Sequence, residues 1–425
     1  MTDDSTPSSS ASPSQRLPTA LVSGDVFLDH LVPDGFPEVP ERIAGAVALI
    51  RALVEAGTIP AEHVLWLDPR PATEAELEAV HDVSYIAHLC DAVASLIERA
   101  ATPGAGQARP RRFTNDVYIS PGSFDAAINA AGAPLVALDA IAEGRARNGY
   151  ALVRPPGHHA RPSGAMGFCL FNNVAVATRY AQRRHGWERV LIVDYDVHHG
   201  NGTQEMFYED PNVLYFSTHQ YPWYPGSGAS DEMGAGVGQG TTINVPLPPG
   251  AGWSVYDPIF RQVLWPAADR FKPDVVLLSA GFDAHFRDPL GEMRLCNADF
   301  SDLTLEVIEI ADRYCSGRVV AVQEGGYDLD AVAQAAATVL VALTGSDGVV
   351  DTLGQPGPTT YVPFEGAEPA VFRWNEQAII NALYDLHGLA GYRRKARRPG
   401  PAPDADQTPP SPTATDIGAP AGPGD

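Results

Sequence analysis

Five short apolar runs, separated by stretches of helical periodicity, limit most strongly how this chain can fold. Each run is apolar on both faces, and the five runs are residues 149–155, 189–196, 212–219, 274–283 and 318–326. Helical patterns alternate with them, for example at residues 40–57, 124–144 and 171–186. Short strands of this kind are typical of a parallel sheet that helices cover on both faces. The pattern therefore predicts one α/β domain over about residues 20–390.

The two ends of the chain differ in composition from the predicted domain. Residues 1–19 are rich in Ser, Pro and Thr, and residues 391–425 are rich in Pro, Ala and Gly without apolar periodicity. Such segments cannot bury enough apolar surface to fold, so we predict two disordered tails. We interpret the basic cluster at 393–398 as a solvated part of the tail, with contact to an anionic partner as the alternative.

Charge and cysteine usage exclude several classes of protein. The chain has 52 acidic and 29 basic residues and a formal net charge of −23, which disfavours broad binding to nucleic acid phosphates. Its four cysteines show no CxxC spacing, so neither a disulfide framework nor a cysteine zinc site is expected. We expect no signal peptide, and no apolar stretch long enough to span a membrane. These features predict a cytoplasmic protein without a membrane partner.

Polar or ionisable residues follow each of the five apolar runs. Parallel strands deliver such residues to one edge of a sheet, where ligands bind in open α/β folds. The segment "DYDVHH" places Asp196 and His198 two residues apart, so both face the same side of an extended chain. Asp283 follows another run and can complete the set. Two carboxylates and one imidazole suit Zn²⁺ or Fe²⁺ and leave positions for water and substrate.

Two adjacent histidines, His158 and His159, lie in the stiff segment "RPPGHHA". A histidine in acid–base catalysis usually has a carboxylate or an amide that orients its second ring nitrogen. Because Asp196 and His198 are assigned to the metal, Asp194 and Asn201 in the same segment remain for this role. Tyr327, in "EGGYD", is a candidate hydrogen-bond donor to the oxyanion of a tetrahedral intermediate, with ordinary packing as the alternative.

These residues belong to longer motifs that resemble the zinc-dependent histone deacetylase family, in its bacterial, class II-like branch. The resemblance covers about residues 20–345 and is carried by "PEVPERI", "LEAVHDVSYI", "NGYALVRPPGHHA", "GFCLFNNVAVA", "VLIVDYDVHHGNGTQ", "FSTHQYPWYPGSG", "INVPLPPG", "SAGFDAHFRDPLG" and "VQEGGYD". It implies the arginase–deacetylase fold, a three-layer α/β/α sandwich around a mostly parallel sheet of about eight strands. One departure is that the family's "HPE" is "FPE" here, with Phe36 in place of His. We expect this position to lie outside the chemistry.

The resemblance also assigns roles to individual residues. It implies that Asp196, His198 and Asp283 hold the metal, that Asp194 pairs with His158 and Asn201 with His159, and that Tyr327 polarises the substrate carbonyl. His159 is the expected general base and acid. The walls of an acetyl-lysine tunnel are implied at Phe168 and Tyr224, with a backbone contact at Gly167 and a grip on the substrate backbone at Asp116. A structural K⁺ site is implied at Asp194, Asp196, His198, Ser217 and Thr218.

The resemblance leaves the substrate open between acylated lysine in proteins and small acetylated amines such as acetylpolyamines. Polyamine-selective relatives often carry an acidic residue at the rim position of Leu290, so the leucine favours acyl-lysine. Two other readings remain as alternatives. A dinuclear manganese ureohydrolase needs further carboxylates and fits the two histidines and Tyr327 badly. A non-catalytic acyl-lysine reader should have lost a ligand or the tyrosine, and this sequence retains them.

Overall fold

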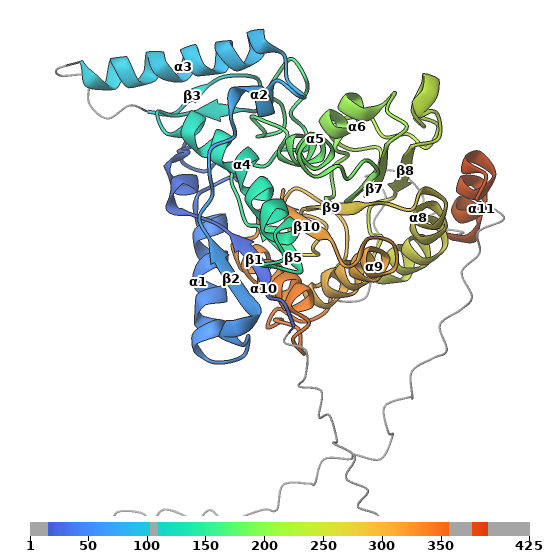
Figure 1. Ribbon diagram of the computed structural model, residues 1–425. Helices are drawn as coiled ribbons and strands as arrows, with labels where there is room; N and C mark the ends of the chain where they lie inside the picture. Colours follow the sequence, from blue (N-terminus) through green and yellow to red (C-terminus); the bar gives the residue numbers. More distant parts are fainter. Residues whose placement is uncertain (1–15, 103–108, 357–375, 390–425) are drawn as a thin grey trace, which may run out of the picture. The chain divides into compact units, whose positions relative to one another are not determined.

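A parallel sheet forms the middle layer of the computed structural model, which describes residues 16–102, 109–356 and 376–389 (Figure 1). All pairings between its neighbouring strands are parallel. In spatial order the eight strands are β2 (Val64–Leu67), β1 (Thr19–Val22), β5 (Asn148–Ala151), β10 (Val319–Gln323), β9 (Val275–Ala280), β6 (Val190–Asp194), β7 (Val213–Gln220) and β8 (Thr242–Leu247). A separate antiparallel pair is formed by β3 (Arg111–Arg112) and β4 (Tyr118–Ile119). The predicted sheet of about eight parallel strands is therefore confirmed.

Each of the five apolar runs overlaps one strand, as predicted. The sequence analysis did not single out the strands β1, β2 and β8. Two of these have only four residues, and β8 includes a proline, so none of them shows a long apolar run. The proposed tails fall largely on residues 1–15 and 390–425, which lie outside the described part of the chain.

Helices cover both faces of the sheet, and alternate strand residues point into the two resulting cores. In β6, for example, Leu191 and Val193 belong to one core, whereas Val190 and Ile192 belong to the other. The first core is covered by α1 (Glu41–Glu55), α7 (Trp253–Ile259), α8 (Trp265–Phe271), α9 (Asn297–Cys315), α10 (Leu329–Thr344) and α11 (Glu376–His387). The second is covered by α2 (Glu74–Leu77), α3 (Val83–Ala101), α4 (Ser123–Ala142), α5 (Asn173–His185) and α6 (Asn201–Phe207). This arrangement is the predicted three-layer sandwich.

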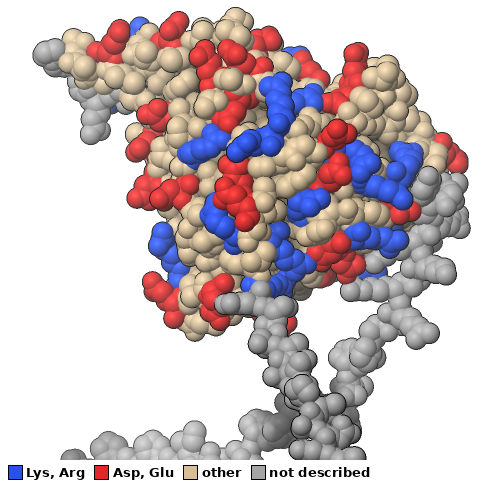
Figure 2. All heavy atoms as spheres, in the orientation of Figure 1, with Lys and Arg blue, Asp and Glu red and all other residues tan. Residues whose placement is uncertain are grey.

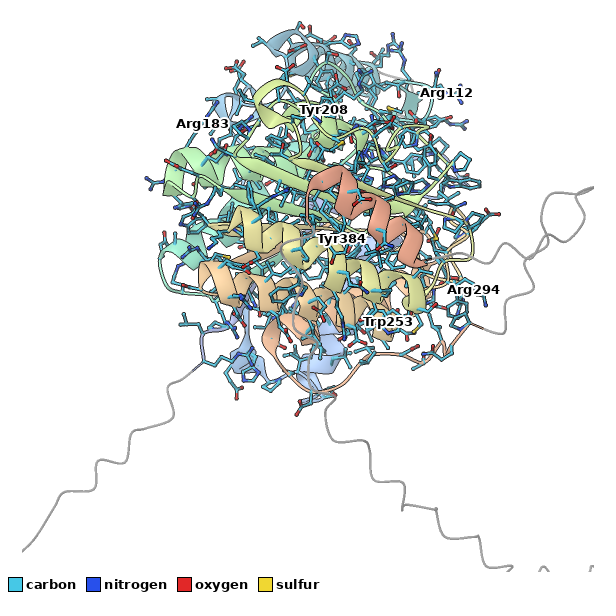
Figure 3. The ribbon with its side chains drawn as sticks, turned by 90° about the vertical axis from the view of Figure 1, so that its right-hand side faces the viewer. Arg112, Arg183, Tyr208, Trp253, Arg294 and Tyr384 are labelled. Carbon is cyan, nitrogen blue, oxygen red and sulfur yellow. The ribbon has the colours of Figure 1, made fainter. Side chains whose placement is uncertain are left out.

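Helix α11 comes last among the described elements and still belongs to the body of the domain. It contacts α7 and the short π-helical turn Phe260–Leu264. Its Ile380, Leu383 and Tyr384 are buried in the first core, and Figure 3 shows α11 lying across this layer with Tyr384 labelled. The compact domain therefore extends at least to this helix.

Helix α4 corrects one expectation from the sequence. Among the described residues it is the one helix long and apolar enough, by length and composition, to cross a membrane, so the expected absence of such a stretch is wrong. The helix packs against α5 and strands β1 and β5, and most of its residues are buried in the second core. Its apolar character follows from this central position.

The face of the molecule drawn in Figure 2 carries both basic and acidic side chains, and neither charge dominates it. Basic and acidic side chains are interspersed there over both the upper and the lower part of the domain. This face therefore offers no continuous basic stripe of the kind that follows a nucleic acid backbone.

Candidate active site

The side chains predicted to form one site do converge at the carboxyl edge of the sheet. Asp196 and His198 follow β6, Asp283 follows β9, the histidine pair follows β5, and Tyr327 follows β10. Because β5, β10, β9 and β6 are neighbours in the sheet, their ends lie side by side. The ring centroids of His159 and His198 are 6.0 Å apart.

Asp196, His198 and Asp283 form a buried cluster whose ligand atoms all lie within 4.8 Å of one another. Nδ1 of His198 is 3.0 Å from Oδ2 of Asp283 and 3.3 Å from Oδ1 of Asp196. Backbone N–H groups hold the carboxylates, with Val197 donating to Asp283 at 2.7 Å and Gly325 donating to Asp196 at 2.9 Å. A Cβ atom at Gly325 would lie 2.2 Å from Oδ2 of Asp283, so only glycine allows the backbone this close.

The electrostatics of this cluster fit a bound cation. Burial and the charge of Asp196 raise the pKa of Asp283 to about 6, because two carboxylates share a site shielded from water. Burial lowers the pKa of His198, but hydrogen bonds to Asp196 and Asp283 more than reverse this and raise it to about 10. A cation would relieve the repulsion between the carboxylates and replace the proton on the imidazole. The donor set therefore suits a metal ion.

The two adjacent histidines have different partners, as predicted. Nδ1 of His158 lies 3.1 Å from Oδ2 of Asp194, which also accepts a hydrogen bond from the Tyr215 hydroxyl at 3.0 Å. Nδ1 of His159 lies 2.8 Å from the amide oxygen Oδ1 of Asn201. The amide oxygen can only accept, so Nδ1 of His159 carries the hydrogen and its Nε2 has a free lone pair.

These partners separate the protonation states of the two rings. Burial lowers the pKa of His158, but the charges of Asp196 and Asp194 outweigh it and raise the pKa to about 10. For His159, burial and the positive charges on His158 and His198 lower the pKa well below its usual value. The partners therefore favour a cationic His158 and a neutral His159 at neutral pH.

Several buried side chains that the sequence analysis missed hold the catalytic loops through backbone groups. The Glu324 carboxylate accepts from the N–H of Gly157 at 2.6 Å and of His158 at 3.0 Å, which fixes the histidine loop. Arg42 donates to the carbonyls of Glu324 and Gly326 at 2.6 and 2.5 Å, and its guanidinium lies 5.0 Å from the centre of the Tyr327 ring. These residues fix the positions of the histidine pair and of Tyr327.

A second carboxylate connects the tyrosine loop to the rim. Asp288 accepts from the N–H of Tyr327 at 2.6 Å through one oxygen and from the N–H of Leu290 at 2.9 Å through the other. The motif "RDPLG" contains this residue, but spacing alone does not reveal that its partner is a backbone group 39 residues away.

A cavity of about 320 Å³ leads from the surface to His159 and His198. Its walls are mainly aromatic and apolar, and they include the predicted Phe168, Tyr224, Leu290 and Tyr327 together with Trp223 and Pro289. Gly167 and Asp116, also predicted, line it as well. Phe168 has φ = 67°, an uncommon conformation for a residue with a side chain. Phe36, which we expected outside the chemistry, packs against this wall residue with ring centroids 4.9 Å apart.

The residues assigned to a K⁺ site also lie close together at the ends of β6 and β7. Asp194 pairs in register with Ser217. The Thr218 hydroxyl is buried and has no hydrogen-bond partner among the described residues. The Ser217 hydroxyl already has a hydrogen-bond partner without an ion, because it lies 2.9 Å from Nδ1 of His219.

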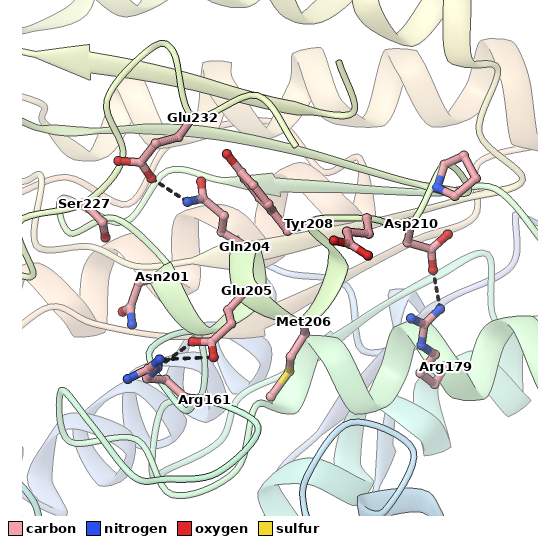
Figure 4. Close-up of a pocket in the computed structure, with 12 residues that line it drawn as sticks. Arg161, Arg179, Asn201, Gln204, Glu205, Met206, Tyr208, Asp210, Ser227 and Glu232 are labelled. Atoms are coloured by element: carbon pink, nitrogen blue, oxygen red, sulfur yellow. Dashed lines mark hydrogen bonds and ion pairs between the residues drawn. The ribbon is translucent and has the colours of Figure 1, made fainter. Parts of the chain in front are cut away.

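A second, polar hollow of about 940 Å³ lies beside α6 (Figure 4). Arg161 pairs with Glu205 and Arg179 with Asp210 along its sides. Asn201 forms part of its lining, so solvent in this hollow can reach the amide that orients His159.

The three-layer fold and the buried Asp–His–Asp cluster beneath an aromatic tunnel define a hydrolase of the arginase–deacetylase class. Residues 36–343 match the histone deacetylase domain family. The chloroplastic histone deacetylase 10 of Oryza sativa subsp. japonica is 39% identical over 329 residues, which are 76% of this chain and 73% of that protein. The polyamine deacetylase HDAC10 of Homo sapiens is 38% identical over 342 residues, which are 79% of this chain and 47% of that protein.

A solved structure agrees with these sequence comparisons. The HDA15 HD domain has a TM-score of 0.73 and 35% identity, and the match covers 88% of this chain and 97% of that one. The chain belongs to the histone deacetylase family, and its activity is that of a deacetylase.

Proposed function

We propose that this protein removes acetyl or other short acyl groups from lysine side chains, releasing the free amine and acetate. The observation that carries the proposal is the cavity of about 320 Å³ with aromatic walls, which reaches His159 and His198 of the Asp–His–Asp cluster and includes the apolar Leu290 in its lining. An extended aliphatic lysine side chain fills such a tunnel, and its acyl group reaches the catalytic residues.

We propose zinc as the metal held by Asp196, His198 and Asp283, with Fe²⁺ as the alternative. When bound, the ion would supply Lewis acidity to the amide carbonyl and lower the pKa of a water molecule. We also propose K⁺ at Asp194, Ser217 and Thr218, together with Asp196 and His198. The buried Thr218 hydroxyl without a partner in the described chain supports this placement.

The protein's own residues then divide the proton transfers. Neutral His159 accepts a proton from the attacking water through Nε2, while Asn201 holds its Nδ1–H. The Tyr327 hydroxyl donates a hydrogen bond to the carbonyl oxygen as that oxygen becomes anionic. A histidine then donates a proton to the leaving amine as the C–N bond breaks. His158, which favours the cationic form beside Asp194, adds positive charge behind the His159 ring, with ring centroids 4.0 Å apart.

A second candidate function is hydrolysis of acetylpolyamines. The observation that favours it is the Asp116 carboxylate in the lining of the tunnel, which could pair with a distal ammonium group. Comparing kcat/KM for acetyl-lysine peptides with that for acetylspermidine and acetylputrescine separates the two functions. We expect higher kcat/KM on the peptides, and a clear preference for the acetylated polyamines would contradict the proposed function.

Replacing Asn201 with Asp should shift the pH dependence of the reaction. A carboxylate beside Nδ1 raises the pKa of His159, and the adjoining hollow admits water that keeps this carboxylate ionised. The imidazole would then stay protonated to higher pH and could not accept a proton. We expect the acidic limb of the kcat/KM–pH profile to move upward by about 1 pH unit or more.

The control for this shift is Asn129→Asp, the same change at a partly exposed position of α4, where the amide donates to the Asp125 carbonyl. This variant should reproduce the wild-type profile. If Asn201→Asp also reproduced it, the division of roles between the two histidines would be wrong.

A further inference from the structure

Two consecutive aromatic residues bridge the mouth of the tunnel on opposite sides. The Trp223 indole N–H donates to the Leu290 carbonyl at 3.0 Å, and the Tyr224 hydroxyl donates to Oδ2 of Asp116 at 2.7 Å. Both aromatic side chains are 38% exposed. The segment after β7 is thereby tied to the loop after β9 and to the loop between β3 and β4.

Asp116 is held in one orientation before any substrate arrives. Its Oδ2 also accepts from the Gly167 N–H at 3.1 Å, and its Oδ1 accepts from the Thr114 hydroxyl at 3.1 Å. A carboxylate offers about four acceptor positions, so about one remains for a further donor. The cavity that leads to His159 includes Asp116 in its lining, so a donor at the mouth can reach this position.

We propose that the Tyr224 hydroxyl is a positioning group that fixes the Asp116 carboxylate. The resemblance to the family implies Asp116 as the grip on the substrate backbone, and the hydroxyl holds it in the orientation in which it accepts a hydrogen bond from a peptide N–H next to the acylated lysine. The inference rests on the proposed lysine deacylase function and adds a positioning residue to it. A phenylalanine at this position would line the tunnel equally well. We therefore assign the hydroxyl to the hydrogen bond that holds Asp116 and not to the tunnel wall.

Two physical effects make the hydroxyl useful for binding. A side chain that is already ordered loses little rotamer freedom when the substrate binds, so more of the new hydrogen bond appears as affinity. Burial and the neighbouring Asp116 raise the pKa of Tyr224, which keeps the phenol protonated and able to donate throughout the working pH range. The hydroxyl acts through Asp116 on the substrate backbone, whereas the Tyr224 ring packs with its centroid 5.2 Å from that of the His159 ring and is retained in a phenylalanine variant.

The test is a double-mutant cycle measured on an acetyl-lysine peptide. Tyr224→Phe should raise KM about tenfold, equivalent to about 1.4 kcal/mol, and leave kcat unchanged. Asp116→Ala should raise KM at least as much. In the Asp116→Ala background, adding Tyr224→Phe should cause no further change, because the hydroxyl has lost the group through which it acts.

Tyr314→Phe is the matched control. Its hydroxyl also donates to a carboxylate, Asp269, at 2.6 Å, but it lies on α9 and does not line the tunnel. This variant should retain the wild-type KM and kcat. A merely structural effect of removing a phenol–carboxylate bond would appear in both phenylalanine variants, most clearly as a fall in thermal stability.

The outcomes separate this inference from the function on which it rests. Wild-type protein that hydrolyses acetylspermidine but not the peptide would overturn both. If the wild type hydrolyses the peptide and Tyr224→Phe retains its KM, the inference alone is overturned. Effects of the two substitutions that multiply in the double variant would overturn it as well, since the hydroxyl would then act independently of Asp116.

Discussion

Asp283→Ala should lose both its metal ion and its deacetylase activity. The remaining ligands, Asp196 and His198, offer one carboxylate and one imidazole, fewer than the three protein ligands typical of catalytic zinc sites. The substitution also frees the Val197 N–H, whose acceptor is Oδ1 of Asp283. Metal analysis of the purified protein, combined with turnover of an acetyl-lysine peptide, measures the two effects separately.

Two further variants make this result interpretable. Asp283→Asn retains an oxygen that can accept from Val197 and removes only the charge, so it should stay folded while binding metal poorly. Burial and Asp196 raise the pKa of Asp283, so its ionised form costs folding free energy when no cation is bound. The substitution also removes the ion pair with His198, which opposes this gain. Stripped of metal at neutral pH, Asp283→Asn should therefore melt close to the temperature of the stripped wild type. Asp91→Ala, on the exposed side of α3, should resemble the wild type in every assay.

A folded Asp283→Ala protein that retains its ion and its turnover would show that the cluster is not the metal site. A variant that retains the ion but loses turnover would assign the metal to other ligands and leave Asp283 a different role. Both results would contradict the proposal that Asp196, His198 and Asp283 together hold one metal ion.

The sequence allowed prediction of the side chains that act at strand ends. Parallel strands bring their carboxyl ends together, so Asp196, His198 and Asp283 could be placed at one edge without knowledge of the contacts between them. The same reasoning offered Asp194 and Asn201 as partners for the two histidines, the resemblance to the family assigned Asp194 to His158 and Asn201 to His159, and the structure has these pairs at 3.1 and 2.8 Å. The alternation of side chains along a strand and the parallel order of the strands are therefore sufficient to predict the metal ligands.

The supporting residues could not be predicted in the same way. Glu324, Arg42 and Asp288 act on backbone N–H and carbonyl groups, and every residue except proline offers an N–H donor as well as a carbonyl acceptor. A motif therefore gives no sign of which distant backbone group such a side chain meets. The contact of Phe36 with Phe168 was missed for a related reason, since aromatic packing depends on the path of two loops and leaves no spacing signal.

Tyr327→Phe should lower kcat by about 10²–10³ with little change in KM, as expected when one donor to a developing oxyanion is removed. The hydroxyl acts only once the carbonyl oxygen becomes anionic, so its loss raises the barrier without weakening substrate binding. The ring itself should stay in place, because it packs against Phe168 with centroids 5.6 Å apart and lies beneath the Arg42 guanidinium.

Tyr256→Phe provides the control for this loss within the same structure. Its hydroxyl is buried near the site but has no hydrogen-bond partner among the described residues, so its removal should leave kcat unchanged and not lower the melting temperature. Burial raises the pKa of Tyr327 well above its usual value, so the wild-type phenol stays protonated across the assay range. The ratio of kcat between wild type and Tyr327→Phe should accordingly be constant from neutral to moderately alkaline pH. An unchanged kcat in this variant would exclude the tyrosine as the oxyanion donor.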